Sequence, residues 1–213
     1  MKISLSGAGK RFNREWIFRN ASLDFLPNTF YAITGPNGSG KSTLLQAIGG
    51  ILGLSEGAIS YYNNAVALSM EKAYQQISFC APYLEVIEEM TLLEFLDFHA
   101  RFKTFLPGIN KEQVISIVGL EASATKQIRN YSSGMKQRVK LAQAIFSNTP
   151  VVLLDEPCSN LDATGIELYH SLISRYCQNR VVIISSNDEQ EFHFVSNRIS
   201  IQDLKLSIGA ARL

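Results

Sequence analysis

The sequence predicts an α/β fold, in which helices cover both faces of a mostly parallel β-sheet, with a β-rich N-terminal portion and a helical insert. Two observations lead to this fold. Short runs rich in valine and isoleucine alternate with helical segments, as in proteins whose parallel strands are joined by helices. Between about residues 83 and 131 this alternation stops, because apolar residues there follow helical spacing.

The N-terminal portion contains most of the expected strands. Glycines and a proline separate its short apolar runs, which is typical of strands joined by turns. A helix is expected over residues 41–51, ended by Gly53. The strands are expected over residues 3–5, 21–26, 29–33, 57–62 and 77–80.

The helical insert is expected over residues 83–135. Pro107 and Gly108 break its helical pattern, which resumes over residues 111–118. We interpret its apolar stripe as mostly core, the alternative being that the edge of the stripe forms a groove for a partner helix. His99, in the middle of the stripe, is expected to be structural or solvated. The stripe consists of Leu92, Leu93, Phe95, Leu96, Phe98, Phe102 and Phe105.

The remaining residues return to alternating helices and buried strands. The chain is therefore predicted to be one domain, 1–213, whose core (1–82 and 136–213) surrounds the insert. Helices are expected over residues 135–146 and 163–176, strands over 151–154 and 181–184, and a closing hairpin over 198–201 and 204–208.

Composition and charge exclude several classes of protein. The 213 residues are 46% hydrophobic and 18% charged, as expected for a globular chain and not for a disordered one. Twenty basic and nineteen acidic residues give a net charge of +1. This balance provides no broad positive surface, so nucleic acid is not an expected partner.

The cysteines and the apolar runs indicate the compartment. Cys80, Cys158 and Cys177 are odd in number, far apart and without metal-ligand spacing, which argues against disulfides and zinc. Cys158 is expected to be a small buried side chain. Since no apolar run reaches the ~20 residues of a membrane span and no signal peptide is evident, we expect a cytoplasmic protein.

A glycine-rich segment provides the strongest chemical signal. Residues 35–42 fit the pattern G-x-x-x-x-G-K-[ST] between a predicted strand and a predicted helix. Its backbone N–H groups and the helix N-terminus favour phosphate, Lys41 can reach the β- and γ-phosphates, and the Ser42 hydroxyl can bind Mg²⁺. The predicted nucleotide-binding residues of this segment are Gly35, Pro36, Asn37, Gly38, Ser39, Gly40, Lys41, Ser42 and Thr43.

A pair of acidic residues supplies a second signal. Asp155 and Glu156 end the buried strand over residues 151–154, at the edge where parallel sheets bind their ligands. In proteins with a phosphate loop the acid that ends such a strand holds Mg²⁺, which we assign to Asp155. Glu156 is then placed to polarise the attacking water. With Lys41, Glu156 forms the predicted catalytic pair.

A third motif completes a resemblance to a known family. The segment 131–138, Tyr-Ser-Ser-Gly-Met-Lys-Gln-Arg, resembles the Leu-Ser-Gly-Gly-Gln signature of ATP-binding-cassette (ABC) proteins, and residues 159–162, Ser-Asn-Leu-Asp, match the loop after their carboxylates. Over essentially the whole chain, the sequence is similar to the ATP-binding subunit of an ABC transporter. The resemblance implies that Ser132 and Gly134 contact ATP held by a second subunit, and that Asp162 lies at that interface.

The resemblance implies a function and its partners. The chain is expected to bind ATP and Mg²⁺, to hydrolyse ATP in a head-to-tail dimer with itself or a related subunit, and to power transport through a separate membrane-spanning partner. That partner would hold it at the inner face of the membrane. Two alternatives stay open: an ABC-type ATPase that is not coupled to transport, and a degenerate ATP-binding subunit with little turnover.

The sequence departs from the family pattern in three places. Pro82 occupies the position of the glutamine that senses Mg²⁺ and water; Tyr83 and Glu85 follow it, and the role stays unassigned. Asn187 replaces the switch histidine, so it can orient a water or a phosphate oxygen but cannot take up a proton. Met135 and Ser133 replace the signature glutamine and first glycine, which predicts a weaker contact across the dimer.

One aromatic residue is a candidate for the adenine base. Phe12 lies upstream of the phosphate loop, where the family stacks an aromatic ring on adenine, and Trp16 is its competitor in the same stretch. The alternative for both residues is ordinary packing.

Overall fold

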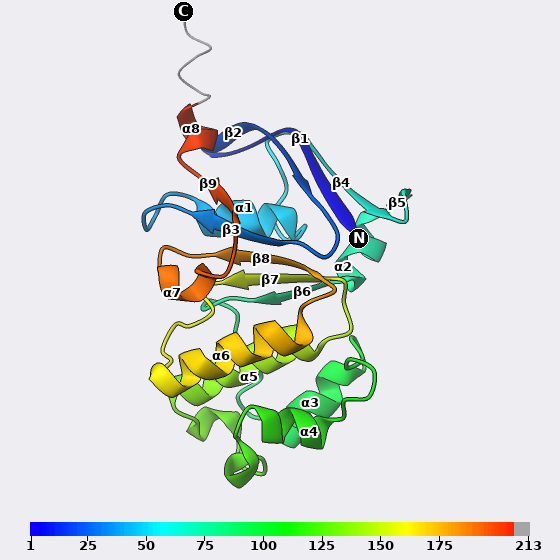
Figure 1. Ribbon diagram of the computed structural model, residues 1–213, viewed down its shortest axis with the longest axis vertical. Coiled ribbons are helices and arrows are strands. Elements are labelled where there is room, and N and C mark those ends of the chain that lie inside the picture. Colours follow the sequence, from blue (N-terminus) through cyan, green and yellow to red (C-terminus); the bar gives the residue numbers. More distant parts are fainter. Residues whose placement is uncertain (207–213) are drawn as a thin grey trace, which may run out of the picture.

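The computed structural model describes residues 1–206 and divides them into an antiparallel sheet, a parallel sheet and a set of helices (Figure 1). The antiparallel sheet has the order β2-β1-β4-β5 and the parallel sheet the order β6-β7-β8-β3-β9. Their strands are β1 (Lys2–Phe12), β2 (Glu15–Phe25), β3 (Phe30–Thr34), β4 (Glu56–Asn63), β5 (Val66–Leu68), β6 (Ile77–Cys80), β7 (Val151–Asp155), β8 (Val181–Ser185) and β9 (Asn197–Ser200).

Helices cover both faces of the parallel sheet. In Figure 1, α1 lies between the two sheets, whereas α5 and α6 lie on the other face with α3 and α4 beyond them. None of the helices over residues 1–206 has the length and apolarity that crossing a bilayer requires. The helices are α1 (Lys41–Ile48), α2 (Met70–Gln75), α3 (Leu92–Ala100), α4 (Lys111–Ile117), α5 (Ser133–Phe146), α6 (Ala163–Tyr176), α7 (Glu189–Phe192) and α8 (Asp203–Leu206).

The central strands divide the apolar residues into two cores. Val151 and Leu153 of β7 pack with α1 and the antiparallel sheet, while Val152 and Leu154 pack with α5, α6 and the insert. Because successive side chains of a strand point to opposite faces, a continuous apolar run serves both cores. The mostly parallel sheet with helices on both faces is confirmed.

The predicted closing hairpin is wrong. Residues 197–200 form β9, which pairs in parallel with β3 at the edge of the sheet, and Leu204 lies in the short helix α8. Residues 207 and 208 of the expected hairpin lie outside the described residues. Parallel pairing joins segments that are distant in sequence, so the local apolar pattern did not distinguish it from a hairpin.

Several element boundaries also differ from the prediction. Both β1 and β2 are longer than expected. In β1, a shift in register between Leu5 and Ala8 lets the strand continue past its glycines. Helix α1 ends at Ile48, three residues before the predicted end. Helix α5 begins at Ser133, so part of the signature lies within the helix.

The aromatic stripe of the insert is only partly core. Phe95 is buried, whereas 37% of Phe98 and 69% of Phe102 is exposed to solvent. Phe102 follows the end of α3 at Ala100, so helical spacing no longer directs it inward. Phe98 is still within α3, and its ring packs against that of Phe102, with the ring centres 5.1 Å apart. His99 is structural, as expected: its Nε2 lies 2.8 Å from the Ser147 hydroxyl, and burial lowers its pKa to about 4.

Candidate active site

The carboxyl ends of three parallel strands place the candidate residues at one edge of the sheet. Strand register aligns Asp155 with Ser185, and Ser185 with Ile33 of β3. The phosphate loop starts directly after β3, so it lies at the same edge as Asp155 and Glu156. Because this edge is where open parallel sheets bind ligands, the sheet itself brings together the loop and the carboxylates.

The conformation of the loop requires glycine at its last turn. Gly40 has φ +107°, and a Cβ atom there would lie 2.2 Å from the Ile17 side chain. Upstream, Ser39 N donates to Pro36 O at 3.1 Å. Gly40 is also the N-cap of α1 and provides no side-chain cap, so the first N–H groups of the helix stay available to an anion.

The Lys41 side chain lies within the curl of the loop. Only 4% of Lys41 is exposed, and its Nζ donates to the Gly35 and Pro36 carbonyls at 2.9 and 3.1 Å. The buried Ser39 hydroxyl has no hydrogen-bond partner among the described residues. A lysine amine, a free hydroxyl and the uncapped helix fit the charge and donor pattern of nucleotide phosphates.

Asp155 fits a cation. Only 1% of the residue is exposed, and its Oδ1 has no hydrogen-bond partner within residues 1–206. Burial raises its pKa, and the nearby Ser42, Ser185 and Tyr83 hydroxyls, with the charge of Lys41, oppose that rise. An orphaned carboxylate oxygen beside the Ser42 hydroxyl is the oxygen donor set that Mg²⁺ prefers.

Glu156 leaves the strand in an unusual backbone conformation. Its φ is +43°, which is uncommon for a residue with a Cβ. Its N–H donates to Ser185 O at 2.9 Å, and its side chain is half-buried, unlike that of Asp155. The chain therefore presents the two acids differently: Asp155 is enclosed, and Glu156 has access to solvent.

Asn187 and Phe12 are both exposed. Asn187 follows β8 and lines a cleft with Gly35 and Pro36 of the phosphate loop, so it lies on the loop's side of the site. Phe12 is 48% exposed and has Lys10 Nζ 5.1 Å from its ring centre. Arg11 and Arg19 stack on Trp16, at 5.6 and 4.6 Å from its ring centre, which leaves Phe12 as the more accessible ring.

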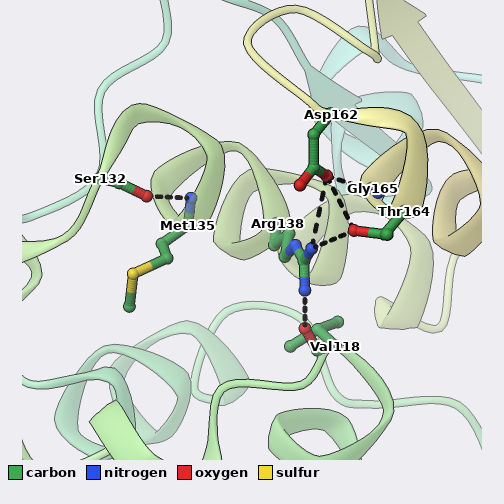
Figure 2. A network of polar contacts seen from close by, with 7 residues as sticks. All are labelled: Val118, Ser132, Met135, Arg138, Asp162, Thr164 and Gly165. Carbon is green, nitrogen blue, oxygen red and sulfur yellow. Dashed lines mark hydrogen bonds and ion pairs between the residues drawn. The ribbon is translucent and has the colours of Figure 1, made fainter.

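The signature segment forms the start of α5. Figure 2 shows Ser132 as the N-cap, its hydroxyl accepting from Met135 N at 3.2 Å. On the next turn Arg138 approaches Asp162 at 3.8 Å. Asp162 in turn caps α6 by accepting from Gly165 N at 2.8 Å. The signature and the loop over residues 159–162 thus form one connected surface.

That surface is separate from the phosphate loop. Ser132, Gly134 and Asp162 line one cleft, and the start of the phosphate loop lines a different one with Asn187. The structure therefore brings together Lys41, Ser42, Asp155, Glu156 and Asn187, but it does not bring the signature residues to them within one chain.

Two buried residues of this region were missed by the sequence prediction. Gln137 is 2% exposed and donates through Nε2 to Pro157 O at 2.7 Å. Glu191 Oε1 accepts from Cys158 N at 2.7 Å, and burial raises the Glu191 pKa to about 7. Both hold the backbone that follows Glu156. Only Gln137 left a signal, as a polar residue on the buried face of an amphipathic helix.

Comparison with known proteins identifies the family. A family model described as ABC transporter matches residues 18–159. A Bacillus subtilis protein, the uncharacterized ABC transporter ATP-binding protein YybJ, is 32% identical over 219 residues, covering 99% of this chain and 94% of that protein. The chain belongs to the ABC transporter ATP-binding protein family. The predicted family is thereby confirmed.

Further matches of this ABC protein support the same fold. Uncharacterized ABC transporter ATP-binding protein YhcH, also from Bacillus subtilis, is 28% identical over 207 residues, which are 93% of this chain and 66% of YhcH. The dimeric structure of MJ0796, a bacterial ABC transporter cassette, has a TM-score of 0.78 at 24% identity and covers 93% of both chains.

Proposed function

We propose that this ABC protein hydrolyses ATP with Mg²⁺ and couples the reaction to transport through a membrane-spanning partner. The observation that supports this most strongly is the shared sheet edge: the phosphate loop, the enclosed Asp155 and the accessible Glu156 follow strands whose register aligns them. A loop that binds nucleotide alone would need neither acid. Two acids with different surroundings provide one group for a cation and one for a water.

Each residue has a distinct task in this proposal. Lys41 and the N–H groups of residues 35–43 bind the phosphates. Ser42 and Asp155 hold Mg²⁺, which when bound neutralises charge on the phosphate oxygens. Glu156 orients and deprotonates the attacking water. Asn187, on the loop's side of the site, provides a hydrogen bond to that water or to a phosphate oxygen, but it cannot take up a proton from the water.

The separation of the two clefts supports a dimer. Ser132 and the N-terminus of α5 form an exposed surface that suits an anion, and the phosphate loop of the same chain lines a different cleft. In a head-to-tail pair, this surface of one copy would face the phosphate loop of the other, and ATP would lie between them. MJ0796, whose fold matches, has a dimeric structure.

An apolar groove supports a membrane partner. The groove, of about 780 Å³, runs between α2 and α3, with the exposed rings of Tyr74, Phe98 and Phe102 along it. Lys103 and Glu85 also line the groove. Exposed aromatic residues bordered by charges suit a short amphipathic helix. Docking there would hold the protein at the inner face of the membrane.

The test is ATP hydrolysis by the purified chain with Mg²⁺. We expect turnover that falls about a hundredfold or more in Glu156→Gln, the loss typical of a missing general base. Glu156→Gln should also form an ATP-dependent dimer in size-exclusion chromatography, since binding persists without turnover. A chain that binds ATP but shows no turnover, even with membrane partner present, would overturn the proposal in favour of a degenerate subunit.

A further inference from the structure

Glu156 is held in a backbone conformation that its surroundings must fix. Its φ of +43° lies in a region that residues with a Cβ rarely adopt, and such a conformation persists only where surrounding contacts determine it. Both polar groups of its backbone are occupied: the N–H donates to Ser185 O at 2.9 Å, and the carbonyl accepts from Ser159 N at 3.1 Å. What remains to be fixed is the following peptide unit, which joins Pro157 to Cys158.

A buried glutamine holds one side of that peptide unit. Gln137 of α5 is buried, and its Nε2 donates to Pro157 O at 2.7 Å. An apolar side chain would fill the same space without the cost of burying an amide, so the hydrogen bond to Pro157 is the feature that requires glutamine here. Because the signature segment forms the start of α5, Gln137 also joins that segment to the chain after Glu156.

A buried glutamate holds the other side. Glu191 of α7 is buried, and its Oε1 accepts from Cys158 N at 2.7 Å. Helix α7 is itself anchored, because the Tyr169 hydroxyl donates to Glu191 O at 2.8 Å. Since α7 begins two residues after Asn187, Glu191 joins the loop that carries Asn187 to the chain after Glu156.

The two contacts fall on opposite ends of one rigid group. Pro157 O and Cys158 N–H belong to the same planar peptide unit, which is trans, so these two groups point in opposite directions. Gln137 donates to the oxygen and Glu191 accepts from the N–H. The proline ring further restricts the backbone at Pro157. The unit therefore cannot rotate without breaking a buried hydrogen bond.

We propose that Gln137 and Glu191 are positioning residues for Glu156, and that they act by clamping the peptide unit between Pro157 and Cys158 from α5 and α7. Fixing this unit fixes the place from which the Glu156 carboxylate reaches the attacking water. Such placement matters because a shift of about 1 Å can lower a rate about a hundredfold. The inference rests on the proposed function, in which Glu156 is the general base.

The first test removes the amide of Gln137 and keeps the length of the side chain. Gln137→Met cannot donate to Pro157 O. We expect kcat to fall about tenfold while the KM for ATP stays within about twofold of the parent, since the residues that bind nucleotide are unchanged. Gln178 precedes β8 and donates to Ser174 O at 3.0 Å, so the control Gln178→Met also loses a hydrogen bond from an amide to a backbone carbonyl, and it should match the parent. A parent kcat in Gln137→Met would overturn the proposal.

A double variant separates positioning from a general loss of structure. In Glu156→Gln there is no base left to position, so adding Gln137→Met should lower the residual rate by less than about twofold. Single turnovers of radiolabelled ATP measure that rate. A further fall of about tenfold in the double variant would assign Gln137 a merely structural role and would overturn the proposal.

Glu191 is tested by two substitutions and by hydrogen exchange. Glu191→Leu removes the acceptor and should lower kcat as Gln137→Met does, whereas Glu191→Gln keeps an oxygen for Cys158 N and should restore most of the parent rate. In Glu191→Leu the Cys158 amide should exchange its hydrogen about tenfold faster than in the parent. Unchanged exchange would overturn the clamp. Because exchange needs no turnover, a parent chain that fails to hydrolyse ATP would overturn the proposed function alone.

Discussion

The phosphate-loop region (residues 35–43 with Asp155 and Glu156) and the signature region (132–138 with 160–162) differ in how much one chain supplies. In the first, Lys41 is 4% exposed and buried polar atoms of Ser39 and Asp155 have no partner within residues 1–206. In the second, Ser132 and Asp162 cap the helices α5 and α6, yet both residues are exposed. In the phosphate-loop region, buried polar atoms lack hydrogen-bond partners among the described residues. In the signature region, Ser132 and Asp162 are hydrogen-bonded within the chain and exposed to solvent.

The difference indicates where a ligand would complete each region. Enclosed polar groups without partners are costly unless a ligand meets them, so we expect nucleotide and cation to complete the phosphate-loop region. An exposed helix N-terminus instead attracts an anion that comes from outside the chain. We therefore interpret the two regions as complementary halves of a site, and the following predictions test that interpretation.

The largest expected effect is the loss of nucleotide binding in the enclosed half. Lys41→Met keeps the apolar stem but removes the charge that would pair with phosphate. We expect ATP affinity to fall roughly 100-fold, equivalent to about 2.7 kcal/mol. Fluorescent ATP titration measures the loss, with Lys126→Met, an exposed lysine of the insert, as the control. Equal affinities for Lys41→Met and the parent would refute the phosphate assignment.

A charge placed in the open half should affect turnover and spare binding. Ser132→Asp keeps a good N-cap residue but adds a negative charge where the phosphate of the other copy would lie. We expect hydrolysis to fall about tenfold while ATP binding by the single chain is unchanged. Ser132→Asn is the matched control, because it caps the helix without the charge. Weakened binding to the isolated chain would show that both halves serve one copy.

Mixing the two variants sharpens this test. In a head-to-tail pair of Lys41→Met with Ser132→Asp, one site contains both defects and the other contains neither. Random pairing should then restore roughly a quarter of the parent activity, because half of the pairs are mixed and each has one intact site of two. Each variant alone would stay below this level, since Ser132→Asp is expected to keep about a tenth of the parent activity and Lys41→Met less. Activity no higher than the average of the separate variants would contradict the shared-site arrangement.

The same contrast explains what the sequence could predict. Residues 35–43 and the pair Asp155–Glu156 are contiguous motifs flanked by strong secondary-structure signals, so their place and chemistry follow from local pattern. Gln137 and Glu191 act on the backbone after Glu156 from distant elements, and no local pattern links them to it. Parallel pairing of β9 with β3 and the exposure of Phe102 depend likewise on tertiary packing.

Glu191 accepts a hydrogen bond from Cys158 N in the segment that follows Glu156, and its titration should affect stability. Its pKa rises from 4.5 to about 7 because burial disfavours the charged form. Between pH 4.5 and 7 the folded state therefore keeps a proton on Glu191 that the unfolded state loses. Over this range the free energy of unfolding falls as the pH rises. Glu191→Gln should stabilise the protein by about 3 kcal/mol at pH 8 and by less than about 1 kcal/mol at pH 5. Denaturant unfolding at both pH values measures this, with exposed Glu189→Gln as the control. A stabilisation independent of pH would contradict the titration.

The smallest effect is expected from the charge of Asp162 in the open half. Asp162→Asn keeps an oxygen that can accept from Gly165 N, which Asp162 contacts at 2.8 Å, but it removes the pairing with Arg138. That pair is solvent-exposed and 3.8 Å apart, so screening by water and salt reduces its contribution to the free energy of unfolding. Thermal melting should therefore give the parent Tm for Asp162→Asn and a lower Tm for Asp162→Ala, which also loses the cap. If the Asn variant melts as low as the Ala variant, the ion pair to Arg138 holds α5 and α6 together, and the open half depends on charge within its own chain.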